Sequence, residues 1–171
     1  APLFVYNNPT NSGTDALSGD DLGLLESEGH VVGVKSTFPT VHQTYEALVA
    51  TTPAFRAFHG GLNAPLEGLA AGACGWISGI LNVAVPSALR LRDTVASGDL
   101  AAARDVWARE LLPIRFIYTK NLLGPINDLE LYRSILRLRG IDPGFSRRPL
   151  LPLTEEQNTR LSSFLEQHEL T

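Results

Sequence analysis

The chain is poor in sulfur-containing residues. Its 171 residues include no methionine and a single cysteine, Cys74. One cysteine excludes an internal disulfide framework, so we expect a protein of the reducing cytoplasm. Because Cys74 lies between Ala73 and Gly75 in an apolar stretch, its position favours a small buried side chain over a reactive thiol. The missing initiator and the apolar run directly after Ala1 lead us to expect that a preceding part of the polypeptide is absent or was removed.

Long apolar runs and an excess of positive charge are also missing. No apolar run reaches the roughly 18 residues of a membrane-spanning helix, and no secretory signal pattern is visible. The formal net charge is -4, and Arg90 and Arg92 are mixed with acidic residues such as Asp93, as on solvated helix faces. We therefore expect neither a membrane nor a nucleic acid as partner. No cluster of His, Cys, Asp and Glu has metal-ligand spacing, so no metal site is predicted.

The first half of the chain alternates between strand-like and helix-like segments. Its 44% hydrophobic and 19% charged residues are typical of a globular protein, and the chain is long enough for a sizeable core. Strand–helix alternation indicates βαβ crossovers and a parallel sheet. In the second helix, Tyr45, Leu48 and Val49 are expected to form one apolar stripe. Strands are expected at residues 3–6, 31–35, 55–59 and 75–78, and helices at 18–29, 40–51 and 63–71.

After Pro86 the pattern changes to helices alone. Pro113 falls inside one of them and is expected to kink or interrupt it. The change predicts a sheet-containing region at residues 1–86 and a helical extension at residues 87–171. The helices of the extension are expected at residues 87–96, 99–118 and 128–139 and from residue 154 onward.

Reactive side chains of parallel α/β folds gather where the strands end. The predicted strand ends supply Tyr6, Lys35, His59 and the turn at residues 78–82. We expect these four elements to face one mouth. The strand ends thus predict where a site would lie, but they do not by themselves predict which reaction it would catalyse.

Lys35 is the most informative of these residues. A lysine that ends an apolar strand must be hydrated, paired or deprotonated, and a desolvated amine can attack a ketone. The alternative is a side chain that simply reaches solvent. Tyr6, at the end of the neighbouring strand, is a candidate proton relay or a half-buried tyrosine with its hydroxyl in water. His59 is a candidate acid, base or polar substrate contact, or a histidine with only a local hydrogen bond.

Several segments resemble one family. Residues 6–13, Tyr-Asn-Asn-Pro-Thr-Asn-Ser-Gly, resemble the Tyr-Asn-x-Pro-x-x-(Ser/Thr)-Gly segment of the dihydrodipicolinate synthase / N-acetylneuraminate lyase family. Residues 32–37, Val-Gly-Val-Lys-Ser-Thr, resemble its Schiff-base lysine strand. Further likenesses, in the family's order, are found at residues 68–78 with Asn82, at residues 97–100 and at residues 147–152.

The resemblance implies a (β/α)8 barrel, a TIM barrel, of which this chain supplies about the last four βα units. Lys35 would be the Schiff-base lysine and Tyr6 the proton-relaying phenol of a class I enzyme. Thr37 and the backbone of Ile77 would lie near the bound 2-oxo acid. Asn11 and His59 complete the set of expected substrate contacts.

Two departures from the family narrow the substrate. Dihydrodipicolinate synthases carry an arginine where this chain has Asn11, and sialic acid lyases carry an acidic pair where it has Leu62 and Asn63. The threonine pair that holds the oxo-acid carboxylate belongs to the family's first half and is not in this chain. The resemblance therefore leaves the acceptor open.

The function predicted from the sequence is that of a lyase, aldolase or dehydratase acting on pyruvate or a 2-keto-3-deoxy acid. No cofactor is expected, because the lysine itself would supply the electron sink. The expected partners are the first barrel half, on the same or a separate chain, and further copies in a homo-oligomer. A non-catalytic half-barrel that binds a 2-oxo acid or a partner chain, and a remnant with a structural role, are the alternatives.

Overall fold

A computed structural model describes residues 1–170 of the chain. The chain divides into two compact units. The first contains residues 1–78 and 92–99, and the second contains residues 79–91 and 100 onward. The turn at residues 78–82 is divided between the two units, whereas the first unit contains the predicted site residues Tyr6, Asn11, Lys35, Thr37, His59 and Ile77.

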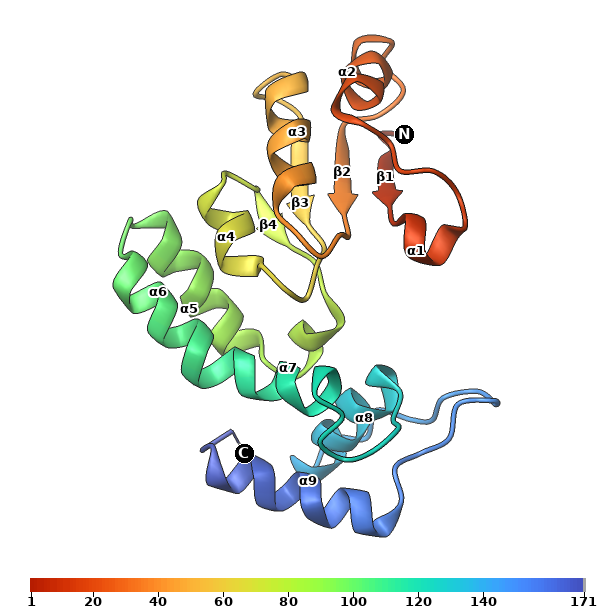
Figure 1. The fold of residues 1–171 in the computed structure, drawn as a ribbon, viewed down its shortest axis with the longest axis vertical. Helices are drawn as coiled ribbons and strands as arrows, with labels where there is room; N and C mark the ends of the chain where they lie inside the picture. Colours follow the sequence, from red (N-terminus) through yellow and green to blue (C-terminus); the bar gives the residue numbers. More distant parts are fainter. Residues whose placement is uncertain (171) are drawn as a thin grey trace. The chain divides into compact units, whose positions relative to one another are not determined.

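The first unit is a four-stranded parallel sheet in the order β1-β2-β3-β4 (Figure 1). The predicted βα alternation is confirmed, and a short helix at residues 9–12 is added to it. β2 begins at Gly33 rather than at residue 31, and β4 has two residues rather than four. The elements are β1 Phe4–Asn7, α1 Pro9–Ser12, α2 Gly19–Ser27, β2 Gly33–Ser36, α3 His42–Ala50, β3 Arg56–His59, α4 Pro65–Ala70 and β4 Gly75–Trp76.

One face of this sheet forms the core with the helices. Val34 is 0% exposed and Ala57 is 2% exposed, and they are register partners on that face. Because side chains alternate along a strand, the residues between them belong to the opposite face. The buried cluster of the helix-facing layer consists of Leu22, Val31, Val34, Ala47, Phe55 and Ala57.

The buried side of α3 differs from the prediction. Tyr45 is 49% exposed and Val49 is 86% exposed, so the expected apolar stripe is wrong for these two residues, whereas Leu48 packs against the core. The helix buries Thr44 and Ala47 instead. The reason is the close approach of α2, in which a Cβ on Gly19 would lie only 2.8 Å from the Glu46 carbonyl oxygen. Small side chains therefore fill the place where α3 meets α2, and Tyr45 and Val49 lie on the solvent side of α3.

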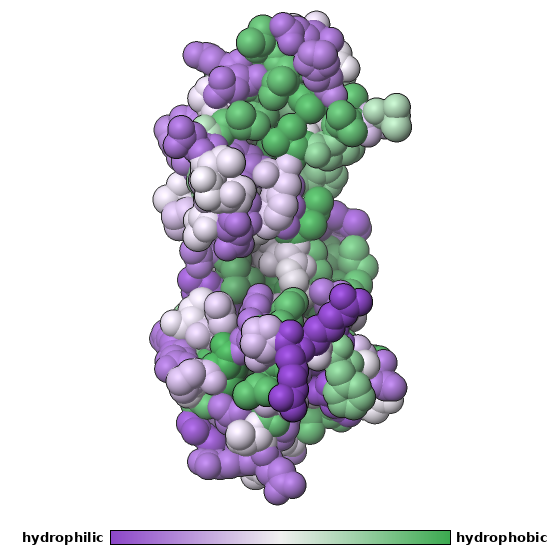
Figure 2. Space-filling view, turned by 90° about the vertical axis from the view of Figure 1, so that its right-hand side faces the viewer, coloured by the Kyte–Doolittle hydropathy of each residue, from purple (hydrophilic) through white to green (hydrophobic). Residues whose placement is uncertain are grey.

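The exposed face of the sheet carries aromatic side chains. Phe4 and Tyr6 are each 53% exposed, and the rings of Phe4 and Phe58 are tilted at 5.8 Å between centroids. Figure 2 shows hydrophobic side chains at the surface in its upper part, where Figure 1 has the first unit. Cys74 is exposed as well, which corrects the expectation of a buried thiol. It directly precedes β4, a two-residue strand that pairs with β3.

The second unit is helical. Pro113 interrupts the long helix as expected, because a proline has no N–H to donate, and five residues of π-helix precede α7. None of the helices among residues 1–170 is long and apolar enough to cross a membrane. The elements after β4 are η1 Gly79–Asn82, α5 Val85–Ala96, α6 Leu100–Val106, the π-helix η2 Trp107–Leu111, α7 Leu112–Thr119, α8 Asp128–Leu138 and α9 Glu155–Gln167.

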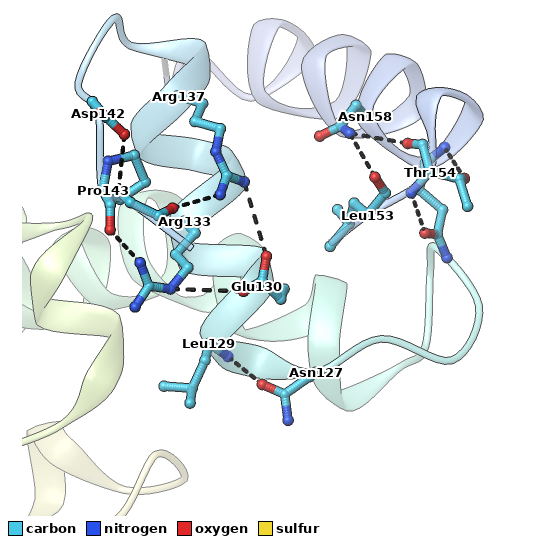
Figure 3. Close-up of polar contacts among 12 residues, drawn as sticks. Asn127, Leu129, Glu130, Arg133, Arg137, Asp142, Pro143, Leu153, Thr154 and Asn158 are labelled. Carbon is cyan, nitrogen blue, oxygen red and sulfur yellow. Dashed lines mark hydrogen bonds and ion pairs between the residues drawn. The ribbon is translucent and has the colours of Figure 1, made fainter. Parts of the chain in front are cut away.

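A buried carboxylate organises α8 (Figure 3). Glu130 is 1% exposed, and its oxygens lie 3.6 Å from Arg133 Nε and 3.9 Å from Arg137 Nη1. Arg133 also donates to the Pro143 carbonyl, and Arg137 donates to the Gly144 carbonyl at 2.8 Å. The two arginines therefore join the buried charge to the loop after α8.

Candidate active site

Lys35 and Tyr6 lie side by side on the exposed face of the sheet. Tyr6 of β1 is the register partner of Lys35 in β2, and Lys35 is the partner of Phe58 in β3. Lys35 Nζ lies 4.0 Å from the centroid of the Tyr6 ring. The sequence predicted that these residues end successive strands, and the parallel register brings the amine to the face of the phenol ring.

The Tyr6 hydroxyl is surrounded by polar groups. The Asn8 side-chain amide donates a hydrogen bond of 2.9 Å to it. Burial by itself raises the pKa of Tyr6, but the Thr37 hydroxyl, the Lys35 ammonium and the Asn8 amide together lower this pKa below its usual value. A phenol whose anion is stabilised in this way gives up its proton more readily, which suits a proton relay.

Thr37 follows β2 and lies close to the same hydroxyl. Its backbone N–H donates to the Asn7 carbonyl at 3.0 Å, which continues the β1–β2 ladder by one step. Thr37 Oγ1 is buried, and its hydrogen-bonding influence on the Tyr6 hydroxyl helps to lower the pKa of that phenol. Thr37 therefore belongs to the polar surroundings of the phenol.

Gly60 gives the Lys35 side chain its room. A Cβ at this position would lie 2.9 Å from both Cγ and Cε of Lys35 and would overlap Thr37 Oγ1. The Gly60 N–H donates to the Ser36 carbonyl at 2.7 Å, so the backbone is fixed there. A glycine pair directly after a predicted strand was the signal in the sequence that could have found this contact.

Two asparagines after Tyr6 also escaped the sequence reasoning. Asn8 is 5% exposed and supports the phenol, whereas Asn7 is 4% exposed and belongs to the helix-facing side. Asn7 accepts from the Leu17 N–H at 3.1 Å and donates to the Leu17 carbonyl at 2.8 Å. The segment between Tyr6 and Leu17 is therefore held at both ends. In the Tyr-Asn-Asn sequence, Asn7 fixes this segment and Asn8 binds the Tyr6 hydroxyl.

His59 does not face the mouth that contains Lys35. Its register partner is Ser36, so its side chain belongs to the helix-facing side of the sheet. The ring packs on Gly68 of α4 and is 1% exposed. The prediction that His59 shares a mouth with Lys35 is wrong, because the strands pair with Lys35 opposite Phe58.

The two remaining predicted contacts lie at the ends of neighbouring elements. The Ile77 N–H donates to the His59 carbonyl at 2.9 Å, which places the backbone of Ile77 beside the end of β3. Asn11 lies in α1, where its side chain is exposed and its N–H donates to the Asn8 carbonyl at 3.2 Å. Both remain proposed substrate contacts.

Comparison with known proteins assigns this arrangement to a class. The model of the dihydrodipicolinate synthetase family matches residues 1–168, and the chain belongs to that family. A 4-hydroxy-tetrahydrodipicolinate synthase of Symbiobacterium thermophilum is 32% identical over 164 residues, which are 96% of this chain and 54% of the relative. A second, from Mycolicibacterium paratuberculosis, is 30% identical over 95% of this chain and 51% of the relative.

Solved structures agree with this assignment. A dihydrodipicolinate synthase of Thermotoga maritima superposes with a TM-score of 0.82 at 26% identity, over 99% of this chain and 57% of that one. A prophage protein of the family from E. coli K12, in complex with pyruvate, gives a TM-score of 0.84 at 22% identity, over 99% and 57% of the two chains. The chain thus spans about half the length of the relatives that it matches.

Proposed function

We propose that this chain provides the Schiff-base half of a class I lyase, aldolase or dehydratase that acts on pyruvate or a 2-keto-3-deoxy acid. The observation that carries the proposal is the pair of Lys35 and Tyr6, with the amine 4.0 Å from the ring centroid at the carboxyl ends of parallel strands. Family membership over residues 1–168 supports it. The finer reaction, and the aldehyde or sugar acid that serves as second substrate, belong to the same proposal.

The chemistry follows from the groups present. The neutral Lys35 amine attacks the C2 carbonyl of the oxo acid, and the carbinolamine loses water to give an imine. The protonated imine then accepts the electron pair that is freed at C3 when a proton or an aldehyde departs. In a dehydratase the enamine formed by loss of the C3 proton expels the hydroxyl group from C4 as water. Tyr6, whose hydroxyl is held by Asn8, carries protons to and from the carbinolamine and the departing group. Thr37 Oγ1 and the backbone of Ile77 would contact the oxo acid.

The site is proposed to be completed by a further barrel half. The sheet and its helices are proposed to be about the last four βα units of a (β/α)8 barrel, with residues 87–171 as a helical extension. The other units would come from an upstream segment or from a separate chain, and the complete protein would be a homo-oligomer of the cytoplasm. The two exposed rings of β1 support this proposal, because barrel interiors are packed cores.

The test is covalent trapping in the complete protein. Incubation with pyruvate and borohydride should give a stable adduct, which peptide mass spectrometry should place on Lys35. The Lys35→Arg variant keeps the charge and should give none. A wild-type protein without an adduct, or with the adduct on Lys120, would contradict the proposal.

A further inference from the structure

His59 is buried at the carboxyl end of the sheet without a function in the chemistry described above. It is 1% exposed, and neither ring nitrogen makes a hydrogen bond of good geometry within residues 1–170, although the Gly61 backbone lies close enough to act on the pKa of the ring. Two buried hydroxyls of the same helix-facing layer share this condition. They are Ser36 Oγ, on the register partner of His59, and Thr44 Oγ1, in the first turn of α3. Buried polar groups without partners are unfavourable, so a cluster of them calls for an explanation.

The ring is held between two glycines. A Cβ on Gly68 would lie 2.5 Å from the ring Cγ, so the backbone of α4 rests on the imidazole. On the other side, a Cβ on Gly61 would lie 3.0 Å from the ring Nε2 and 2.6 Å from the Phe38 carbonyl oxygen. Gly61 is therefore wedged between the His59 ring and the loop that follows β2.

The same loop reaches Lys35 through its other glycine. Gly60 lies against Cγ and Cε of Lys35, at the distances given above. The Gly61 carbonyl accepts a hydrogen bond of 3.0 Å from the Trp76 indole, which fixes the loop from β4. The loop at residues 60 and 61 therefore lies between two side chains. Gly61 contacts the imidazole of His59, and Gly60 contacts the side chain of Lys35.

We propose that His59 is a positioning residue for the imine chemistry. Its neutral ring packs against Gly61 and stands beside its register partner Ser36. It thereby holds Gly60 and Gly61 against Lys35 and so keeps the amine at the face of Tyr6. Burial lowers the pKa of His59, against weaker opposite effects of Glu67 and of the Gly61 backbone, which keeps the ring neutral near pH 7. The inference rests on the proposed function of Lys35 and adds a residue from the other face of the sheet.

The test compares the reactivity of Lys35 with the stability of the complete protein. His59→Leu keeps most of the volume but removes both nitrogens, and with them the polar contact of the ring with the Gly61 backbone. We expect the rate constant for the pyruvate adduct trapped on Lys35 to fall about 10- to 100-fold, the scale of a misplaced reacting group. The melting temperature should change little, because the volume is kept and no hydrogen bond of good geometry is lost. His59→Gln retains an amide near the position of Nε2 and should stay within about threefold of the wild-type rate.

Leu22→Ala is the matched control. Leu22 is 2% exposed in the same helix-facing layer, and its truncation should lower the melting temperature but leave the trapping rate of the folded protein unchanged. Ser36→Ala gives a second measurement if His59→Leu does not fold, and it should slow trapping several-fold. Wild-type trapping rates in His59→Leu, or in Ser36→Ala where the first variant is unfolded, would refute the positioning role. A wild-type protein that forms no adduct on Lys35 would instead overturn the proposed function and this inference with it.

Discussion

At the scale of single residues, the candidate site depends on how the side chains of Lys35, Tyr6 and Asn8 pack together. Lys35 is the register partner of Tyr6, and Gly60 leaves the space in which the lysine side chain lies. Asn8 holds the phenol from the side of α1 with a hydrogen bond of 2.9 Å. Amine, phenol and amide are therefore placed by three different segments of the chain, and the backbone at residue 60 limits where the amine can go.

The hydroxyl of Tyr6 can be tested apart from its ring. Tyr6→Phe should keep the fold, because the side chain is 53% exposed and the change leaves the ring in place. Turnover by the complete protein should fall about 10²- to 10⁴-fold, the scale of a lost general acid or base. Steady-state kinetics with pyruvate as one substrate measures the change in kcat.

The control for this variant is Tyr45→Phe on α3. Tyr45 is 49% exposed and belongs to the solvent side of the helix, so its kcat should equal that of the wild type. An unchanged kcat in Tyr6→Phe would remove the phenol from the mechanism and leave Lys35 to act with another proton donor.

At the scale of elements, the helix α8 shows what a buried charge does in the second unit. Glu130 lies within 4 Å of two arginines that also hold the carbonyls of residues 143 and 144. A buried carboxylate is tolerated when it is paired, and removal of one partner leaves the others without compensation. The loop after α8 is therefore held by Arg133 and Arg137, and the carboxylate of Glu130 in α8 pairs with both of these arginines.

Glu130→Ala should lower the free energy of unfolding of the complete protein by about 1 to 3 kcal/mol. This decrease is smaller than the one expected on breaking a fully buried ion pair, because Arg133 and Arg137 are 29% and 31% exposed and are partly solvated. Urea denaturation followed by circular dichroism measures it. Asp105→Ala, at an exposed position of α6, should change the same free energy by less than about 0.5 kcal/mol. Equal changes in the free energy of unfolding for the two substitutions would show that the pairing of Glu130 with the two arginines does not stabilise the protein.

At the scale of the whole molecule, the sheet of the first unit has one covered face and one exposed face. Phe4, Tyr6 and Ile77 are exposed to 53%, 53% and 43%, although they belong to or directly follow strands. β1 pairs only with β2, and β4 only with β3, among residues 1–170. An apolar face and unpaired strand edges are surfaces that other strands tend to cover.

Residues 1–171 purified alone should therefore associate or exchange rapidly at the outer strands. Sedimentation velocity should show concentration-dependent assembly, and amide hydrogen exchange should be fast in β1 and β4 and slower in β2. The proposed reason is that about four further βα units normally close such a sheet into a barrel. A monodisperse monomer with slow exchange in all four strands would show that this half stands alone.

The sequence by itself determined the order of strands and helices and the residues at the strand ends. Apolar runs and turn residues are local signals, and they located β1, β3 and the ends of the helices to within a few residues. The same reasoning identified Tyr6 and Lys35, because both end an apolar run before a polar segment. The interruption at Pro113 was also predictable, since a missing N–H is a property of the residue itself.

The tertiary structure alone decided which side chains share a face. Lys35 and His59 both end predicted strands, yet the register pairs Lys35 with Phe58 and Ser36 with His59. A shift of one residue between strands moves a side chain to the opposite face, and no pattern within a single strand fixes that shift. The exposure of Tyr45 and Val49 likewise followed from the close approach of α2 to α3. Local chemistry thus named the candidate residues, and the pairing of segments distant in sequence decided which of them meet.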